Sequence, residues 1–149
     1  MRVQQTKLVA YLSVCFVVGL CIELFAQPYA IAISRGLDFT AMVAAQVHDD
    51  LGDSLALPFK FIPFVGLGLF AAWADCRDGA KAAIVSLLLY VAAFTGTYLY
   101  GFFAAERVFK NGYRTAAALN AGLPWLLATL SLAAFPLVSL ALRRVLNAR

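Results

Sequence analysis

The chain has 149 residues, of which 63% are hydrophobic and only 13% are charged, and its formal net charge is +4. Soluble domains contain about 45–50% apolar residues and about 25% charged ones, and a small globule has too little interior to bury more apolar surface than that. The composition therefore excludes an ordinary soluble domain. The basic residues form no run interleaved with aromatic side chains, so no nucleic-acid partner is expected.

The apolar residues gather in four blocks, each about as long as the 20-residue helix that crosses a bilayer. The blocks cover residues 8–26, 55–74, 82–105 and 116–142. Backbone groups in hydrocarbon must be hydrogen-bonded internally, and no alternation of period two indicates a barrel, so the blocks are expected to be helices. No repeat or linker divides the chain. The sequence predicts a single all-α domain over residues 1–149, an integral membrane four-helix bundle.

The first block begins like a signal peptide, because Arg2 and Lys7 precede the apolar run and Ala30-Ile31-Ala32 resembles a cleavage site. The run is longer than the apolar core of a typical signal peptide, however, and Glu23 lies in its distal part. We therefore expect a retained membrane anchor rather than a cleaved signal.

Two ionisable residues, Glu23 and Lys60, lie inside the first two blocks, where a charge is costly. At the rise of an α-helix, both lie about 8 Å below the same face of the hydrocarbon core, on consecutive antiparallel helices. We expect them to face each other. The pair has two readings: it sets the register of the two helices, or Glu23 binds a proton or cation beside Lys60. Alternatively, Lys60 extends alone to the headgroups.

The connection between the first two blocks, residues 27–54, contains a further predicted helix over residues 39–51. Asp38 suits its N-cap and Gly52 suits the position after its end. The spacing gives the helix an apolar face and a polar one, so it is expected to lie on the outer membrane surface or to cap the bundle. The apolar face is formed by Phe39, Met42, Val43 and Val47, and the polar end by His48, Asp49, Asp50 and Asp53.

The polar end of this helix resembles a metal site only in its residue types, because His48 and three aspartates match no recognised spacing. A solvated acidic helix end is the favoured interpretation, and no metal is expected. Simple packing is likewise favoured over partner binding for the apolar face. Any protein partner would nevertheless be expected to use this helix, because it is the largest extramembrane feature.

The third and fourth blocks contain polar and helix-bending residues. Thr95 and Tyr98 either line a polar cavity or belong to helix packing and the interfacial aromatic belt, and the second interpretation is favoured. Ala92 and Gly96 have the small-xxx-small spacing of a close helix contact. Prolines in the second and fourth blocks predict kinks; they are Pro58, Pro63, Pro124 and Pro136.

Lysine and arginine counts orient the chain. With both termini inside, seven basic residues lie inside and four outside, which favours cytoplasmic termini. The third connection, residues 106–115, is basic yet falls outside, through Arg107, Lys110 and Arg114. Either the acidic residues of the first connection neutralise it, or it meets lipid headgroups. No organelle-targeting signal is present, so a bacterial inner membrane is expected.

The three cysteines, Cys15, Cys21 and Cys76, form no Cys-x-x-Cys motif, so neither thiol redox chemistry nor a zinc site is indicated. No cofactor is expected. Three function classes remain, in order of preference. The first is a non-enzymatic binding protein, either an accessory subunit or a toxin-immunity protein. The second is a proton- or ion-coupled transporter or channel subunit using Glu23 and Lys60. The third is a lipid-modifying or conjugating enzyme, which needs a pocket with convergent polar groups. The expected partners are membrane lipids and a second protein or a second copy of the chain.

Overall fold

The computed structural model describes residues 2–52 and 57–148, and every regular element in this part of the chain is helical. The all-α prediction is thereby confirmed for the described residues. The elements are α1 (Arg2–Arg35), α2 (Phe39–Gly52), α3 (Leu57–Lys60), α4 (Ile62–Asp78), α5 (Ala80–Lys110), α6 (Arg114–Ser131), the 3-10 helix η1 (Leu132–Ala134) and α7 (Phe135–Asn147).

Three helical segments are long and apolar enough to cross a membrane, namely Gln4–Arg35, Ala80–Lys110 and Arg114–Asn147. The second predicted block differs, because its main helix, α4, has only 17 residues, or about 25 Å of helix against a hydrocarbon core of about 30 Å. Pro63 lies in the first turn of α4 and lacks a backbone N–H. The short helix α3 precedes it as a separate turn.

The helices run well beyond the predicted apolar blocks at several ends. α1 continues past Ala26 to Arg35, with Pro28 fully buried inside it, so the predicted connection from residue 27 is wrong. α5 continues to Lys110, where basic side chains in the last turn favour the helix dipole. The predicted loop 106–115 is therefore too long, since only residues 111–113 connect α5 to α6. The fourth block breaks at η1, just before Pro136.

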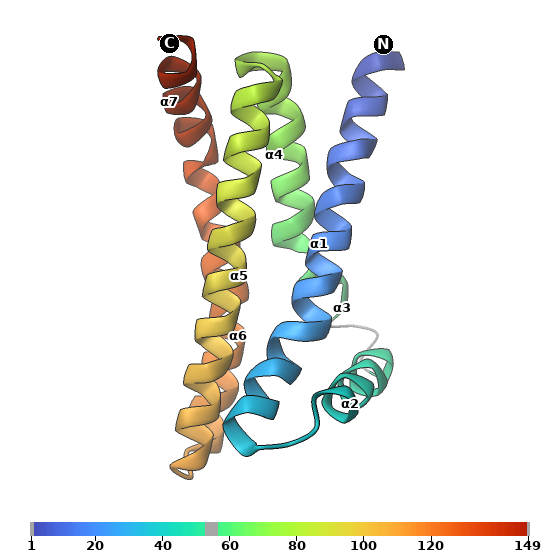
Figure 1. Cartoon of the computed structure of the whole chain (residues 1–149), viewed down its shortest axis with the longest axis vertical. Helices are drawn as coiled ribbons and strands as arrows, with labels where there is room; N and C mark the ends of the chain where they lie inside the picture. The colour runs from blue at the N-terminus through green and yellow to red at the C-terminus, as the bar shows by residue number, and fades with distance from the viewer. Residues whose placement is uncertain (1, 53–56, 149) are drawn as a thin grey trace.

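The helices lie side by side along one long axis (Figure 1). α5 is central, because it contacts α1, α4, α6 and α7. The two termini and the α4–α5 turn lie at one end of the molecule, and α2 and the α5–α6 turn lie at the other (Figure 1). α4 accompanies the half of α1 nearer the termini. In the other half, α1 and α6 flank α5 and make little contact with each other.

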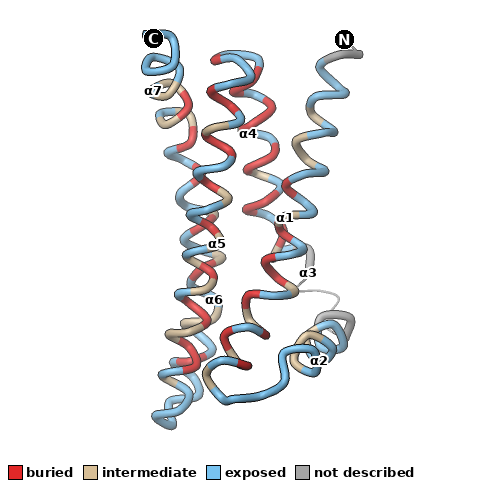
Figure 2. The backbone as a smooth tube through the Cα atoms, in the orientation of Figure 1, coloured by how far each residue is buried: buried red, intermediate tan, exposed pale blue. Residues whose placement is uncertain are grey.

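Aromatic side chains fill the space between the helices. Phe64 of α4 packs against Phe94 of α5 with ring centroids 5.8 Å apart, and Tyr90 of α5 packs against Phe135 of α7 at 4.9 Å. Figure 2 shows buried residues on the faces that the long helices turn toward one another. The outward faces are apolar too, and Leu119, for example, is 73% exposed. Such a surface is suited to lipid rather than water.

Polar side chains join the helices near the termini. The Lys7 ammonium lies 3.1 Å from the Asp75 carboxylate, which links α1 to α4. The buried Ser139 hydroxyl of α7 donates to the Asp78 carboxylate of α4 at 2.8 Å. Arg143 lies 3.6 Å from the same carboxylate. These contacts could not be predicted from the sequence, because they depend on which helices become neighbours.

The opposite end is joined by a bidentate ion pair between α1 and α5. Arg35 donates to both carboxylate oxygens of Glu106, at 2.6 and 2.8 Å, and its guanidinium stacks on the Phe109 ring. Lys110 donates to the Ser34 carbonyl oxygen. Among the described residues, Glu106 is thus paired with Arg35, and Lys110 with the Ser34 carbonyl oxygen rather than with an acidic side chain of the first connection.

The helix α2 forms where it was predicted, over Phe39–Gly52 instead of 39–51. The Asp38 carboxylate accepts from the backbone N–H of Ala41 at 2.9 Å, as an N-cap should. The Phe39 ring packs against Phe25 and Tyr29 of α1, with centroids 6.2 and 6.4 Å away. The rest of the predicted apolar face is less covered: Met42 and Val43 are half-buried and Val47 is exposed.

At the polar end of α2, His48 and Asp49 are exposed. Asp53 and the side chain of Asp50 lie outside the described residues. The apolar face of α2 is therefore turned in part toward α1, which agrees with packing as the main role of this helix.

Candidate ligand-binding cleft

Glu23 and Lys60 line the same cavity, which has a volume of about 390 Å³. Four helices form its walls, and α1 and α5 each contribute two residues one helical turn apart. The lining residues are Glu23 and Gln27 of α1, Phe59 and Lys60 of α3, Tyr98 and Phe102 of α5, and Ala121, Gly122 and Trp125 of α6. The volume falls in the range of about 300–1,000 Å³ that is usual for small-molecule pockets.

Glu23 is buried, with 8% of its surface exposed, and Lys60 is half-buried. The sequence predicted that these two residues approach each other from consecutive helices, and they line one cavity. A direct ion pair between them stays a prediction. Because the two charges are opposite, the cavity has no net formal charge when both residues are ionised.

Tyr98 brings a polar atom into this cavity. The residue is only 2% exposed, and its hydroxyl has no hydrogen-bond partner in the part of the chain that the structure describes. The Glu23 carboxylate lies near this hydroxyl and interacts with it, although the pair does not form a regular hydrogen bond. Buried polar groups are nearly always hydrogen-bonded, so the Tyr98 hydroxyl is positioned to donate either to Glu23 or to a ligand in the cavity.

Trp125 fixes the wall formed by α3. Its indole N–H donates to the backbone carbonyl oxygen of Phe59, so the short helix α3 is attached to α6 across the cavity. The Trp125 and Phe102 rings then stand with Phe59 around the polar groups. The cavity thus combines aromatic side chains with a small number of hydrogen-bonding and charged groups.

A second cavity, of about 260 Å³, continues toward the α5–α6 turn. It shares Gln27, Phe102 and Ala121 with the first cavity, and it also contacts Glu106 and Arg114. The two cavities therefore form one continuous cleft, which we call the α1–α6 cleft. It lies over α5, between two helices that make little contact with each other.

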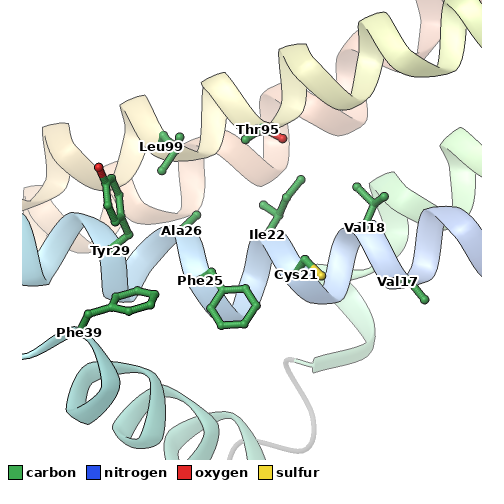
Figure 3. Close-up of a pocket in the computed structure, with 10 residues that line it drawn as sticks. All are labelled: Val17, Val18, Cys21, Ile22, Phe25, Ala26, Tyr29, Phe39, Thr95 and Leu99. Atoms are coloured by element: carbon green, nitrogen blue, oxygen red, sulfur yellow. The ribbon is translucent and has the colours of Figure 1, made fainter.

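The structure separates the polar residues that the sequence placed in the third block. Tyr98 lines the α1–α6 cleft, whereas Thr95 lines a different groove, of about 460 Å³, between α1 and α5. Figure 3 shows this groove, where Val18, Ile22 and Leu99 lie around Thr95 and Phe39 closes one end. The Thr95 hydroxyl donates to the Val91 carbonyl oxygen at 2.8 Å. This groove is apolar, and among the described residues no buried polar atom on its walls lacks a hydrogen bond.

The other predicted site residues are spread over the surface. Arg107 and Lys110 are exposed in the last turn of α5, and Arg114 alone reaches the outer part of the α1–α6 cleft. Among the described residues, no group of three or more His, Cys, Asp and Glu side chains is arranged to hold a metal ion. Gln27 and Phe59 were missed, although Gln27 lies one helical turn after Glu23 and so had to share its face.

No protein-family model matches this chain, and no curated protein and no solved structure is similar to it. The cleft must therefore be interpreted from its own chemistry.

Proposed function

We propose that this protein crosses a membrane four times and, as a transporter or channel subunit, binds a proton or small cation at Glu23, with Lys60 beside the carboxylate. The observation that carries the proposal is the convergence of both intramembrane charges with Gln27 and Tyr98 on one cavity. Ionisable residues at this depth mark ion pathways and proton relays, because their placement is costly. From the sequence alone, partner binding ranked first; we now prefer transport, and the convergence of the two charges on one cavity supports that preference.

The fourth crossing is supported by the position of α4. This helix packs between α1 and α5 and contacts both, and its 17 residues match the lower end of the range of about 17–25 that crosses a bilayer. The even number of crossings agrees with the two termini lying at one end (Figure 1). The excess of basic residues at that end favours the cytoplasm, and we propose a bacterial inner membrane.

The chemistry follows from the low dielectric constant of the cleft. While the Lys60 ammonium is close, the Glu23 carboxylate is stabilised as an anion. When the ammonium withdraws, an unpaired carboxylate becomes costly and takes up a proton or a cation instead. Withdrawal of the Lys60 ammonium, which a long flexible side chain carries at the end of α3, is therefore the step that exchanges the partner of Glu23.

Proton flux into liposomes tests the proposal. Purified protein is reconstituted into liposomes that contain a pH-sensitive dye, and a potassium diffusion potential drives the flux. We expect the wild type to carry protons and Glu23→Gln to lose the flux at equal protein incorporation. Asp49→Asn is the matched control, because it removes an exposed carboxylate on α2 and should leave the flux unchanged. Equal flux in all three proteins, or none in the wild type, would overturn the proposal.

A second candidate function is the binding of a protein partner, and one observation favours it. The polar end of α2 presents His48 and Asp49 to the surface, and Val47 beside them is exposed as well. Crosslinking in native membranes followed by mass spectrometry tests this candidate. A stoichiometric partner joined through α2 supports it, and a homo-oligomer without contacts through α2 opposes it.

A further inference from the structure

We infer that the α1–α6 cleft binds an uncharged, lipid-soluble ring compound with a carbonyl or hydroxyl group, of the quinone or quinol class. The inference deepens the proposed function and depends on its four-pass arrangement, because that arrangement places the cleft within the bilayer. We assign binding of this compound to the cleft and no chemical reaction on it.

Two neutral hydrogen-bonding side chains, those of Tyr98 and Gln27, line the cavity. The buried Tyr98 hydroxyl has no hydrogen-bond partner within the described residues. The Gln27 side chain, which lines the same cavity, is likewise in no hydrogen bond with another described residue. A phenol and an amide both donate and accept hydrogen bonds, so together they match a carbonyl or a hydroxyl group on a ligand.

The cavity carries no net formal charge while Lys60 stays beside Glu23. The two residues line the same cavity and cancel each other formally, so a cation can compete for Glu23 only when the Lys60 ammonium withdraws. Bringing a charged molecule out of water into this cavity would be costly without a compensating countercharge. An uncharged ligand avoids that cost and still satisfies the Tyr98 hydroxyl.

The walls of the cavity are partly aromatic. Phe102 and Trp125 line it together with Phe59, whose side chain is largely exposed, and aromatic rings pack favourably against a flat ring at offset or edge-to-face angles. The hydrogen bond from Trp125 to the Phe59 carbonyl oxygen fixes the Trp125 ring relative to α3. A planar head group with polar substituents can therefore pack against these rings.

A ligand can reach the cleft from the bilayer. The cleft lies between α1 and α6, which make little contact with each other and both belong to segments apolar enough to cross a membrane. A ligand dissolved in the bilayer can enter between these helices and leave an apolar tail among the lipids. The stretch between the two ends of the cleft is apolar, with Ile31, Ala105 and Ala118 on its walls.

The two tryptophans of the chain provide an internal test. Trp125 lines the cavity, whereas Trp73 of α4 lies near the termini under the Arg77 guanidinium, 4.0 Å from its ring centroid. Quinones quench tryptophan fluorescence on contact. Decylubiquinone is therefore titrated into Trp73→Phe protein, which retains Trp125, and into Trp125→Phe protein, which retains Trp73, both in lipid nanodiscs.

We expect saturable quenching in the Trp73→Phe protein and only weak, unsaturable quenching in the Trp125→Phe protein. Tyr98→Phe, added to Trp73→Phe, keeps the ring and removes the hydroxyl, so the affinity should fall about tenfold. Gln27→Met gives a second, independent loss if the Tyr98 variant is unstable. Thermal unfolding curves and circular dichroism check that each variant is folded.

Two charged probes of similar chain length, decanoate and decyltrimethylammonium, are titrated in parallel. Tighter binding of either probe than of decylubiquinone, or an unchanged affinity in both the Tyr98 and the Gln27 variants, would overturn the inference. The proposed function fails separately: if Glu23-dependent proton flux is present but decylubiquinone does not bind, only the ligand class is wrong. If decylubiquinone binds but no flux depends on Glu23, the transport role is wrong and the binding site stands.

Discussion

Asp38 fixes the start of α2 with a single carboxylate, which accepts hydrogen bonds from the Thr40 hydroxyl and the Ala41 backbone N–H. The Thr40 hydrogen bond, and then that of Ala41, lower the pKa of the Asp38 carboxyl. An unfolded aspartate titrates near pH 3.9. Because the folded pKa is below that value, the ionised cap contributes its full stability above about pH 3.9, and the contribution is lost as the pH falls through the folded pKa.

We therefore expect Asp38→Ala to reduce the hydrogen-exchange protection of the α2 amides about fivefold at neutral pH, the usual effect of losing an N-cap. Asp38→Asn should keep most of the protection, because asparagine also caps well, and should remove the loss below pH 3.9. Exchange followed by mass spectrometry measures this, after correction for the intrinsic pH dependence. Asp49→Asn, at the other end of α2, is the control. Unchanged protection in Asp38→Ala would show that packing of Phe39 alone holds the helix.

At the residue scale, the residues that could be singled out from the sequence are those that are unusual in their local sequence context. Glu23 and Lys60 are charges in apolar blocks, and Asp38 precedes an amphipathic stretch, so each has a local physical reason. Tyr98 and Thr95 looked equivalent in the sequence, yet they line different cavities. Residues three apart on a helix differ by about 60° in direction, and only the positions of neighbouring helices decide which cavity each one meets.

The contact between α5 and α6 depends on a glycine that the sequence did not single out. The small-xxx-small pair Ala92 and Gly96 predicted a close approach, but both residues are exposed and no atom lies within 4 Å of a Cβ built on Gly96. Gly101 instead faces Pro124, and a Cβ there would lie 2.9 Å from the proline Cδ and closer still to its Cγ. The small-xxx-small spacing of Ala92 and Gly96 therefore lies on an exposed face of α5 and does not mark the contact with α6.

Gly101→Ala should therefore destabilise the protein by about 1–3 kcal/mol, the usual cost of overpacking a tight contact, because α6 must move away from α5. Gly96→Ala is a matched control in the same helix. Since nothing opposes its added methyl group, it should be neutral or stabilising by up to about 1 kcal/mol. Reversible unfolding in mixed micelles compares the two. Equal effects of the two substitutions would mean that the close contact between Gly101 and Pro124 contributes nothing to stability.

The existence of the helices followed from apolar runs, but their ends did not. α1 and α5 extend past their apolar blocks to Arg35 and Lys110, where Arg35 is held by Glu106 of the other helix. Such mutual support cannot be read from either segment alone. The second block was weakened for a local reason, since Pro63 removes a backbone donor where a longer helix would need one. The α1–α6 cleft lies beyond the end of this short helix, where α3 contributes Phe59 and Lys60 to the cavity wall.

For the whole molecule, the number of crossings is the property that connects the fold to the proposed function. Three segments are long and apolar enough to cross, and α4 is the fourth that we propose. Three crossings would place the N- and C-termini on opposite sides of the membrane, and four would place them on the same side. In Figure 1 the termini lie together, at the end opposite the α5–α6 turn. Side-specific labelling therefore decides whether α4 crosses.

We expect Asn111 in the α5–α6 turn to be outside and both chain ends to be inside. Cys15, Cys21 and Cys76 are replaced by alanine, and single cysteines are introduced as Asn111→Cys, Ala148→Cys or Gln4→Cys, all at exposed positions. A membrane-impermeant maleimide should label the first in intact cells and the other two only after permeabilisation.

If positions 4 and 148 are labelled from opposite sides, α4 does not cross. In that case α4 cannot pack between α1 and α5 as it does here, and Lys60 loses the position that places it in the cavity with Glu23. The same experiment thus tests the geometric basis of the cleft, because the site exists only if the short helix completes the bundle.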